Sequence, residues 1–485
     1  MANFASNVFK LVSASLTAQI IGLLLVPIIT RLYTPDDFGV FQLIISIASI
    51  VGVVSCFSYH TAIMLPKDDS EAQDLLVLCF ILLFFVVSLF SLITIIFSKN
   101  IIIYLNAPYI IPYLPYLSLF ILVDGIFSIY NYWLTRKEEF GTLGSSRVLR
   151  ALTTKGLQII LGTVLFSPAG LILGYIAGYT VSDFIMVRKS PSLLSLLSKV
   201  SPSSLKKVAI RYKKFPIYST GSAFATNLSI QVPSLMLALF YDTTVVGLYS
   251  LSYTVVNVPS NMIGQSLGQA FFQKAMHDKN NKGSVKYISY KVYATLVSLG
   301  LFPMLLLMVM SKDLFNFAFG SEWVDAGTYT MILIPWLFLV FISSPLSSLF
   351  SVLEKQDVGF KFQIALMVSR IISLFVGGSF GGPLFALSLF SLTGIIFWSW
   401  MNYYLLKSAG ITIKETKHVF FKNLRQSIIL IVPILLGKFL MVNFIILVCL
   451  VMLVTVIYYI PVIKDEFDLD IIDYLKKYYY IYVKF

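Results

Sequence analysis

The sequence predicts an all-α polytopic membrane protein made of two related halves. Of its 485 residues, 58% are hydrophobic and only 12% are charged, whereas a soluble protein carries about 25% charged residues. Apolar runs of about 20 residues recur from end to end, and each can cross a bilayer core of about 30 Å. Helices are expected because they satisfy their own backbone polar groups in lipid, whereas a transmembrane β-barrel would show short alternating segments.

A short polar hinge at residues 31–41 separates the first two apolar runs and returns later in the chain. Pro35 cannot continue a membrane helix, and Gly39 opens the next one. Six hinge residues match a second stretch 208 positions on, namely Leu32, Tyr33, Phe38, Gly39, Val40 and Phe41 with Phe240, Tyr241, Val246, Gly247, Leu248 and Tyr249. Polar residues beside the hinge keep this shift: Gln19 with Asn227, Gln42 with Ser250, Ser46 with Thr254 and Ser49 with Asn257. This internal repeat predicts two halves that face one another.

Hydropathy places fourteen membrane segments along the chain, and twelve is the alternative if the last pair does not span. The segments are 11–30, 38–60, 75–98, 113–135, 151–167, 169–187, 215–240, 244–272, 288–311, 327–353, 362–379, 383–406, 427–441 and 443–463. We expect an N-terminal lobe at 1–187 and a C-terminal lobe at 215–406, joined by a basic linker at 188–214 with some amphipathic helix on the membrane surface. A connector at 407–426 leads to the last two spans at 427–463 and to a tail at 464–485.

The net charge of +13 is explained by membrane orientation. If the N-terminus is cytoplasmic, the inner segments carry 30 of the 36 Lys and Arg residues and the outer loops carry four. The positive-inside rule then places both termini in the cytoplasm. A nucleic-acid partner is not needed to explain this charge. The first apolar stretch is long enough to span and lacks a small-residue cleavage site, so we expect a transmembrane helix there rather than a signal peptide.

No constellation of an enzyme is found in the sequence. The three cysteines lie in apolar runs, and the three histidines lie near inner helix ends or loops. Neither residue type has the spacing of a metal site, and there is no phosphate-binding glycine-rich loop. We therefore expect no catalytic residues, no metal and no bound cofactor.

Amide side chains form a stripe on the eighth predicted helix, where Asn257, Asn261, Gln265, Gln269 and Gln273 recur every fourth residue. One interpretation is hydrogen bonding between packed helices. The other is the wall of a water-filled cavity for a polar substrate, because such a stripe is costly against hydrocarbon. The regular spacing and a matching stripe on the second helix favour the cavity. The other predicted wall residues are Gln42, Ser46, Ser49, Asn227 and Gln231.

Four charged residues are candidates for binding an anionic substrate or a coupling ion. Lys155 and Arg370 each lie in the fifth helix of their half, and membrane cations pair, snorkel or face water. Arg31 lies at the outer mouth, where anchoring to lipid headgroups is the alternative. Asp124 lies near the middle of the fourth helix, as a candidate ion-coupling site, a counter-ion of Arg370 or a packing acceptor.

With Pro-Ile-Ile-Thr-Arg-Leu-Tyr-Thr-Pro-Asp-Asp-Phe-Gly-Val-Phe at residues 27–41 after a polar first helix, the chain resembles the polysaccharide-transporter branch of the multidrug/oligosaccharidyl-lipid/polysaccharide (MOP) exporter superfamily. It is most similar to the bacterial O-antigen and capsule repeat-unit flippases. The resemblance implies two six-helix lobes around a central cavity and alternating access that is driven by ion coupling or otherwise without ATP, with H⁺ and Na⁺ as the candidate coupling ions. It also implies that the substrate is an undecaprenyl-diphosphate-linked oligosaccharide used to build lipopolysaccharide or another surface polysaccharide. The protein would move this substrate from the cytoplasmic to the periplasmic leaflet of the inner membrane.

Three other functions remain open at this stage. A flippase for lipid-linked peptidoglycan precursors would suit fourteen spans, and a multidrug or metabolite exporter of the same fold would need a more apolar or acidic cavity. A membrane polymerase or ligase, from a different class, should carry a large outer loop with catalytic charges, and the sequence has no such loop. Expected partners are the lipid-linked oligosaccharide, membrane lipids and other polysaccharide-assembly membrane proteins.

Overall fold

The computed structural model describes residues 2–105, 108–198 and 200–467, and every regular element within them is a helix. Thirteen of these helices are long and apolar enough to cross a membrane. The remaining predicted span falls in α12 (Thr243–Lys282), a helix of 40 residues whose amide-rich sequence leaves it outside the apolar set. The prediction of an all-α multi-pass membrane protein is therefore confirmed. Most of the predicted tail, from residue 468 on, lies outside the described residues.

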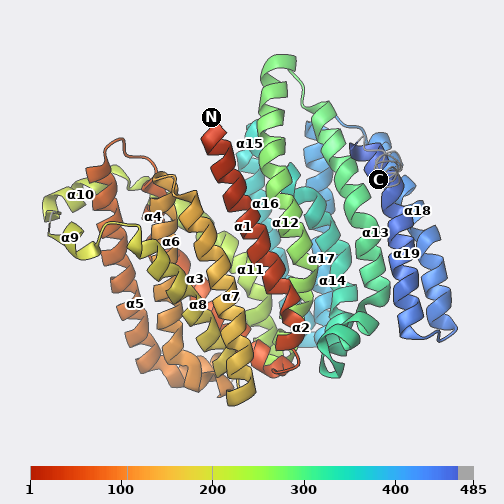
Figure 1. Cartoon of the computed structure of the whole chain (residues 1–485), viewed down its shortest axis with the longest axis horizontal. Helices are drawn as coiled ribbons and strands as arrows, with labels where there is room; N and C mark the ends of the chain where they lie inside the picture. Colours follow the sequence, from red (N-terminus) through yellow and green to blue (C-terminus); the bar gives the residue numbers. More distant parts are fainter. Residues whose placement is uncertain (1, 106–107, 199, 468–485) are drawn as a thin grey trace, which may run out of the picture. The chain divides into compact units, whose positions relative to one another are not determined.

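The chain divides into two compact units, and the first comprises residues 1–258, 314–329 and 363–390. In this unit α7 packs against α1 and α8, and α6 packs against α3, α5 and α8 (Figure 1). Its helices before α12 are α1 (Ala2–Leu24), α2 (Val26–Ile29), α3 (Pro35–Val54), α4 (Tyr59–Ala62), α5 (Asp69–Leu105), η1 (Pro108–Tyr113), α6 (Leu114–Arg136), α7 (Phe140–Leu165), α8 (Ala169–Arg188), α9 (Leu193–Leu197), α10 (Pro202–Arg211), η2 (Phe215–Ser219) and α11 (Thr220–Phe240).

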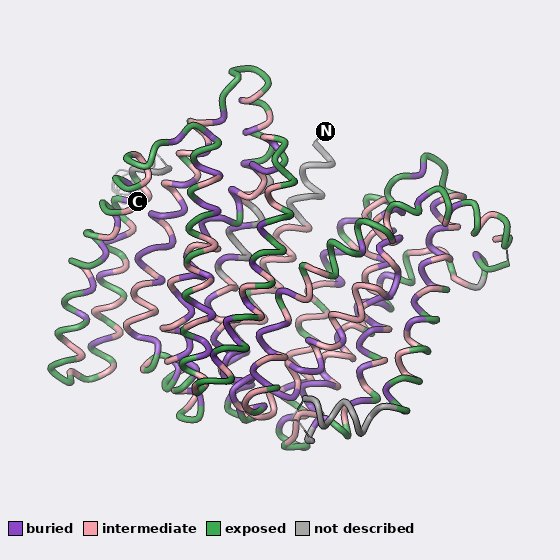
Figure 2. Tube along the Cα trace, turned by 180° about the vertical axis from the view of Figure 1, so that it is seen from behind, coloured by how far each residue is buried: buried purple, intermediate pink, exposed green. Residues whose placement is uncertain are grey.

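The second unit comprises residues 259–313, 330–362 and 391–485. The helices from α13 on, parts of which belong to the first unit, are α13 (Lys286–Phe319), η3 (Ser321–Trp323), α14 (Val324–Leu346), α15 (Leu349–Val352), α16 (Gln356–Phe380), α17 (Pro383–Ser408), α18 (Ile413–Phe439) and α19 (Phe444–Phe467). Helices α18 and α19 pack together and share a core that includes Phe302, Ile434 and Tyr458. Exposed apolar side chains follow both helices along their length (Figure 2), as expected of helices that face lipid.

Two helix boundaries near the candidate site differ from the prediction. Helix α7 begins at Phe140 rather than at residue 151, so Arg147 and Arg150 lie on a helix and not in a loop. The second predicted span, 38–60, ends at Val54, because left-handed backbone at Phe57 and Ser58 interrupts the helix. The predicted linker 188–214 contains two short helices, α9 and α10, as expected for a partly helical segment.

The two hinges of the internal repeat begin their helices with equivalent caps. At the first hinge, the Thr34 hydroxyl accepts a hydrogen bond from the backbone N–H of Asp37 at 3.2 Å. At the second, a carboxylate oxygen of Asp242 accepts from the backbone N–H of Val245 at 2.8 Å. Each cap satisfies an N–H group that the helix start leaves unpaired. Both donor and acceptor positions are related by the shift of 208 residues.

The two hinges also pack against each other reciprocally. A Cβ placed on Gly39 would lie 1.7 Å from the Thr243 carbonyl oxygen, and one placed on Gly247 would lie 1.8 Å from the Pro35 carbonyl oxygen. Because Thr243 and Gly247 are the repeat equivalents of Pro35 and Gly39, the two contacts are the same contact made twice. The Thr243 hydroxyl adds a hydrogen bond to the Asp36 carboxylate. This arrangement confirms the internal repeat that the sequence predicts.

We expect Gly39→Ala to lower the melting temperature of the purified protein, because the added methyl group has no space beside the Thr243 carbonyl. Overpacking of this kind costs about 1–3 kcal/mol. The matched control is Gly156→Ala on α7, where no atom lies within 4 Å of the added Cβ. That change should leave stability equal or slightly higher, since alanine favours helix more than glycine does. Equal melting temperatures for both variants would contradict the reciprocal contact.

Candidate functional site

A cavity of about 290 Å³ lies in the first unit between α1, α3, α7 and α8. Its lining contains two cations and no carboxylate. The lining residues are Gly22, Phe41, Ile45, Arg150, Ala151, Thr154, Lys155, Gln158, Tyr175 and Tyr179. A cationic cavity in an apolar helical body is the arrangement expected for an anionic ligand, since unpaired charge is costly there.

The residues of α7 that line the cavity are spaced so that they lie on one face of the helix. Arg150, Thr154 and Gln158 recur every fourth residue and therefore share one side of the helix. Glycines of α8 let α7 approach closely, because a Cβ on Gly178 would lie 1.9 Å from the Thr154 hydroxyl oxygen, and one on Gly174 would lie 2.7 Å from Cγ of Gln158. Small residues at a four-residue spacing thus let the two helices pack closely.

Aromatic rings hold the Arg150 guanidinium. Its carbon Cζ lies 4.4 Å from the centre of the Phe127 ring and 4.5 Å from that of Tyr179. Tyr179 stacks on Tyr175 at 4.6 Å between ring centres, and Phe41 meets Tyr175 edge-on at 6.0 Å. Cation–π contact strengthens away from water, so these rings stabilise the positive charge without neutralising it.

The second cation of the cavity, Lys155, is held by an amide. Its ammonium group donates to Oε1 of Gln158 at 3.2 Å, and Nε2 of Gln158 donates to the Leu171 carbonyl at 3.0 Å. In the described part of the chain, no carboxylate forms an ion pair with Lys155 or with Arg150. Both charges therefore remain available to an anion that enters the cavity.

The backbone beside this amide is anchored from the first hinge. The Tyr33 hydroxyl donates to the Gln158 carbonyl oxygen at 2.7 Å. Burial, together with the nearby Asp37 carboxylate, raises the pKa of Tyr33 to about 12. The phenol therefore stays protonated and keeps donating at any physiological pH. The hinge and the cavity wall are thus physically joined.

Two acids lie behind the cavity. Asp124 interacts with the Tyr179 hydroxyl and lies within electrostatic reach of Arg150. Asp183 on α8 is only 6% exposed, and within the described residues neither of its carboxylate oxygens has a hydrogen-bond partner. A buried, unpaired carboxylate is costly to keep charged. Asp183 is therefore a second candidate for ion coupling, and the sequence analysis missed it.

Arg147 continues the cationic face of α7 without lining the cavity. Its guanidinium donates to the Ser15 hydroxyl at 2.8 Å and to Oδ1 of Asn131 at 3.2 Å. Ser15 belongs to the polar first helix, so one function of that polarity is to hold this arginine.

The predicted cation Arg370 lies elsewhere in the first unit. It is 9% exposed, and its Nη1 atom donates to the carbonyl oxygen of Ser229 at 2.9 Å and to the hydroxyl at 3.1 Å. The Phe390 ring centre lies 5.7 Å from its guanidinium carbon. In this structure Arg370 links α16 to α11, and its predicted role towards a diphosphate stays a prediction.

The predicted polar wall is distributed over several helices. Nε2 of Gln42 donates to the Ser46 hydroxyl at 3.2 Å, which in turn donates to Oε1 of Gln231 at 3.0 Å and is fully buried. These three residues connect α3 with α11. Ser49 and Asn257 are half-buried, and Oδ1 of Asn227 is buried without a partner among the described residues.

Three other predicted wall residues lie on α12, but their side chains fall outside the described set: Asn261, Gln265 and Gln269. The last of the predicted cations, Arg31, is exposed, and its Nη2 atom donates to the Phe317 carbonyl at 3.1 Å. Phe317 belongs to the final turn of α13, where a cation is favoured by the helix dipole.

The fold is shared with solved structures of a lipid flippase and of a MATE family transporter of the MOP superfamily. It matches a structure described as "Lipid II flippase MurJ, inward closed conformation" with a TM-score of 0.71 at 16% identity, over 96% of this chain and 99% of that chain. It matches an inward-facing multidrug resistance MATE family transporter with a TM-score of 0.57 at 12% identity, over 80% of this chain and 95% of that chain.

Within that class, the chain belongs to the family described as "Polysaccharide biosynthesis protein", which it matches over residues 28–328. It is 24% identical over 392 residues to the lipopolysaccharide biosynthesis protein WzxC of Escherichia coli (strain K12), covering 77% of this chain and 75% of that protein. It is 20% identical over 301 residues to the teichuronic acid biosynthesis protein TuaB of Bacillus subtilis (strain 168), covering 60% of each. These matches confirm the resemblance on which the sequence analysis relied.

A single cysteine at Thr154 tests the charge and wetness of the cavity. In a background without Cys56, Cys79 and Cys449, we expect Thr154→Cys to react with water-soluble thiol reagents. An anionic sulfonate reagent should react roughly tenfold faster than a cationic one, because the two cations raise its local concentration. The control is Ile160→Cys on the other side of α7, where Ile160 is 60% exposed. This cysteine should face lipid and react with neither reagent. Protection at residue 154, or faster reaction with the cationic reagent, would contradict a hydrated cationic cavity.

The amide stripe of α12 has a separate test in the same cysteine-free background. We expect Asn261→Cys and Gln265→Cys to react with water-soluble reagents, because a four-residue stripe of amides is costly against hydrocarbon. Labelling is measured by mass shift of the intact protein. Protection at both positions would favour interhelical packing over a cavity wall.

Proposed function

We propose that this protein is a flippase for undecaprenyl-diphosphate-linked oligosaccharide repeat units of O-antigen or another surface polysaccharide. It moves them from the cytoplasmic to the periplasmic leaflet of the inner membrane by alternating access. The observation that carries this proposal is the cavity in which Arg150 and Lys155 lie without a carboxylate partner in the described structure.

The chemistry of such a substrate fits the cavity. A diphosphate is anionic, and arginine binds phosphate oxygens through paired N–H donors. The Gln158 amide and the Thr154 hydroxyl can hydrogen-bond sugar hydroxyls, while the rings of Tyr175 and Tyr179 offer flat apolar faces to a sugar ring. The polyprenyl tail can stay in lipid, where the exposed apolar helix surfaces already lie.

The relatives support the same substrate class. Two are described as biosynthesis proteins for lipopolysaccharide and teichuronic acid, and a structural neighbour is described as a lipid II flippase. Transport rather than catalysis is the role that this family and fold favour. A cationic cavity does not favour the exporter or polymerase alternatives. A peptidoglycan-precursor flippase would bind the same diphosphate chemistry, so the polysaccharide substrate is favoured by the family and by the two biosynthesis relatives.

Energy for transport would come from an ion that binds behind the cavity. Asp124 and Asp183 are the candidate residues, because both are acids within the membrane body and the second lacks a partner among the described residues. H⁺ or Na⁺ bound there would change the net charge next to Arg150. Such a change would alter how strongly the cavity attracts a diphosphate.

The decisive experiment replaces Arg150 in a strain that lacks the chromosomal gene. We expect Arg150→Gln to reduce export of surface polysaccharide at least tenfold at normal membrane levels of the protein. The lipid-linked oligosaccharide should then accumulate on the inner leaflet, where its mass identifies the sugar. The physical reason is the lost phosphate ligand, since a charged hydrogen bond contributes about 1.5–3 kcal/mol.

The matched control is Arg188→Gln. That arginine also lies over an aromatic ring, with 4.1 Å between its guanidinium carbon and the centre of Phe184, but it does not line the cavity. The control should export normally. Wild-type export by Arg150→Gln would remove the cavity from the mechanism.

A further inference from the structure

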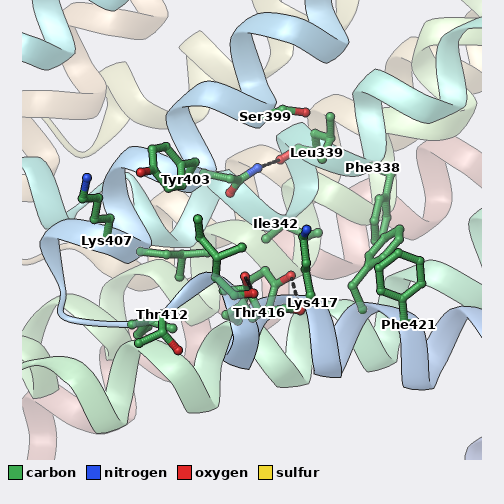
Figure 3. A pocket seen from close by; sticks show the side chains of 16 residues that line it. Phe338, Leu339, Ile342, Ser399, Tyr403, Lys407, Thr412, Thr416, Lys417 and Phe421 are labelled. Carbon is green, nitrogen blue, oxygen red and sulfur yellow. Dashed lines mark hydrogen bonds between the residues drawn. The ribbon is translucent and has the colours of Figure 1, made fainter.

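A second cavity, of about 420 Å³, lies wholly within the second unit, between α13, α14, α17 and α18. Lys407 lies at one end of it, Phe338 and Phe421 lie at the other end, and Lys417 lies between them (Figure 3). The loop from α17 to α18 closes one side, and the sequence predicts that this loop is cytoplasmic.

The interior of this cavity is mainly apolar, because most polar side chains of its wall donate to backbone carbonyls, and Oδ1 of Asn402 is a buried atom without a partner among the described residues. Nδ2 of Asn402 donates to the Leu339 carbonyl at 3.2 Å, and the Tyr293 hydroxyl donates to the Thr416 carbonyl at 3.4 Å. The Thr416 hydroxyl donates to the carbonyl of Ile413 at 3.0 Å. What these groups leave for an occupant is mainly hydrocarbon and aromatic surface.

The mouth of the cavity carries positive charge without a compensating acid. Lys407 and Lys417 are exposed, and in the described part of the chain neither forms an ion pair. The Nζ atom of Lys407 lies 5.4 Å from the centre of the Tyr403 ring. The nearby Glu415 does not line the cavity, because it pairs with Lys286 at 2.9 Å and caps α18 through Thr412.

We propose that this cavity binds an anionic phospholipid of the inner leaflet, with an acyl chain in the apolar interior and the phosphate between the two lysines. An apolar body with one anionic end is the chemistry that this wall and this mouth recognise. Tyr403, Ile413 and Phe421 are exposed large apolar side chains that line the cavity, so the cavity continues into the lipid-facing surface. A free phosphate would leave the interior unfilled. The inference does not depend on which substrate the protein transports.

The test is native mass spectrometry of the full-length protein in mild detergent, with added phosphatidylglycerol or phosphatidylethanolamine. We expect phosphatidylglycerol to bind, and to bind at least fivefold more tightly than the zwitterionic lipid. The double variant Lys407→Gln with Lys417→Gln should bind it roughly tenfold more weakly. The matched control is Lys361→Gln with Lys414→Gln, which removes two exposed lysines that do not line the cavity and should bind normally.

A third variant separates the cavity from surface charge. Ser399→Trp places a large ring in the cavity while both lysines stay, so it should also abolish tight binding of phosphatidylglycerol. Equal binding of the two lipids, equal loss in the control pair, or unchanged binding in Ser399→Trp would each overturn the proposal. Displacement of the bound lipid by undecaprenyl phosphate, but not by excess phosphatidylglycerol, would assign the cavity to the transported lipid and overturn it as well.

Discussion

The structure depends first on the close approach of two helix starts that are copies of one another. Gly39 lies against the backbone at Thr243, and Gly247 lies against the backbone at Pro35. Only glycine permits backbone contact this close, so both copies of the repeat keep glycine at the same position. From the first hinge, Tyr33 reaches the Gln158 carbonyl. From the second, Tyr241 reaches the carbonyls of Gly377 at 3.3 Å and Gly381 at 2.8 Å. Each hinge thereby fixes helices of its own half.

The low dielectric of the membrane body decides where charge can be kept. Arg150 is stabilised by two aromatic rings and Lys155 by one amide. In the described structure neither forms a direct ion pair, although Asp124 and Asp183 lie within electrostatic reach of Arg150. Arg370 is stabilised differently, because its Nη1 atom donates hydrogen bonds to the carbonyl and the hydroxyl oxygen of Ser229. A cation whose donors are already taken stabilises the fold. A cation held only by rings retains its donors for a ligand.

Sequence patterns predicted the parts of this structure that repeat or alternate. The helices and the internal repeat follow from hydropathy and fixed spacing, and the structure confirms them. Arg150 was missed because four cations between residues 136 and 150 resemble a solvated inner loop. Its spacing with Thr154 and Gln158 was the signal that could have placed it on the helix. Asp183 gave no such signal, because its importance comes from the absence of partners around it, which only packing reveals.

The two halves share a hinge, but they hold the cations of their fifth helices differently, and this difference bears on function. Helix α16 begins 216 residues after α7 and ends 215 residues after it, so Arg370 is at the position of Thr154 or Lys155. In the first half Arg150 and Lys155 have no ion-paired carboxylate among the described residues, whereas Arg370 in the second half donates to Ser229. An anion entering the protein meets unpaired positive charge at the α7 cavity, and the candidate coupling acids Asp124 and Asp183 lie behind the same cavity. The hinges are therefore a symmetric pair, whereas the cavity with two cations and no carboxylate in its lining belongs to the first half.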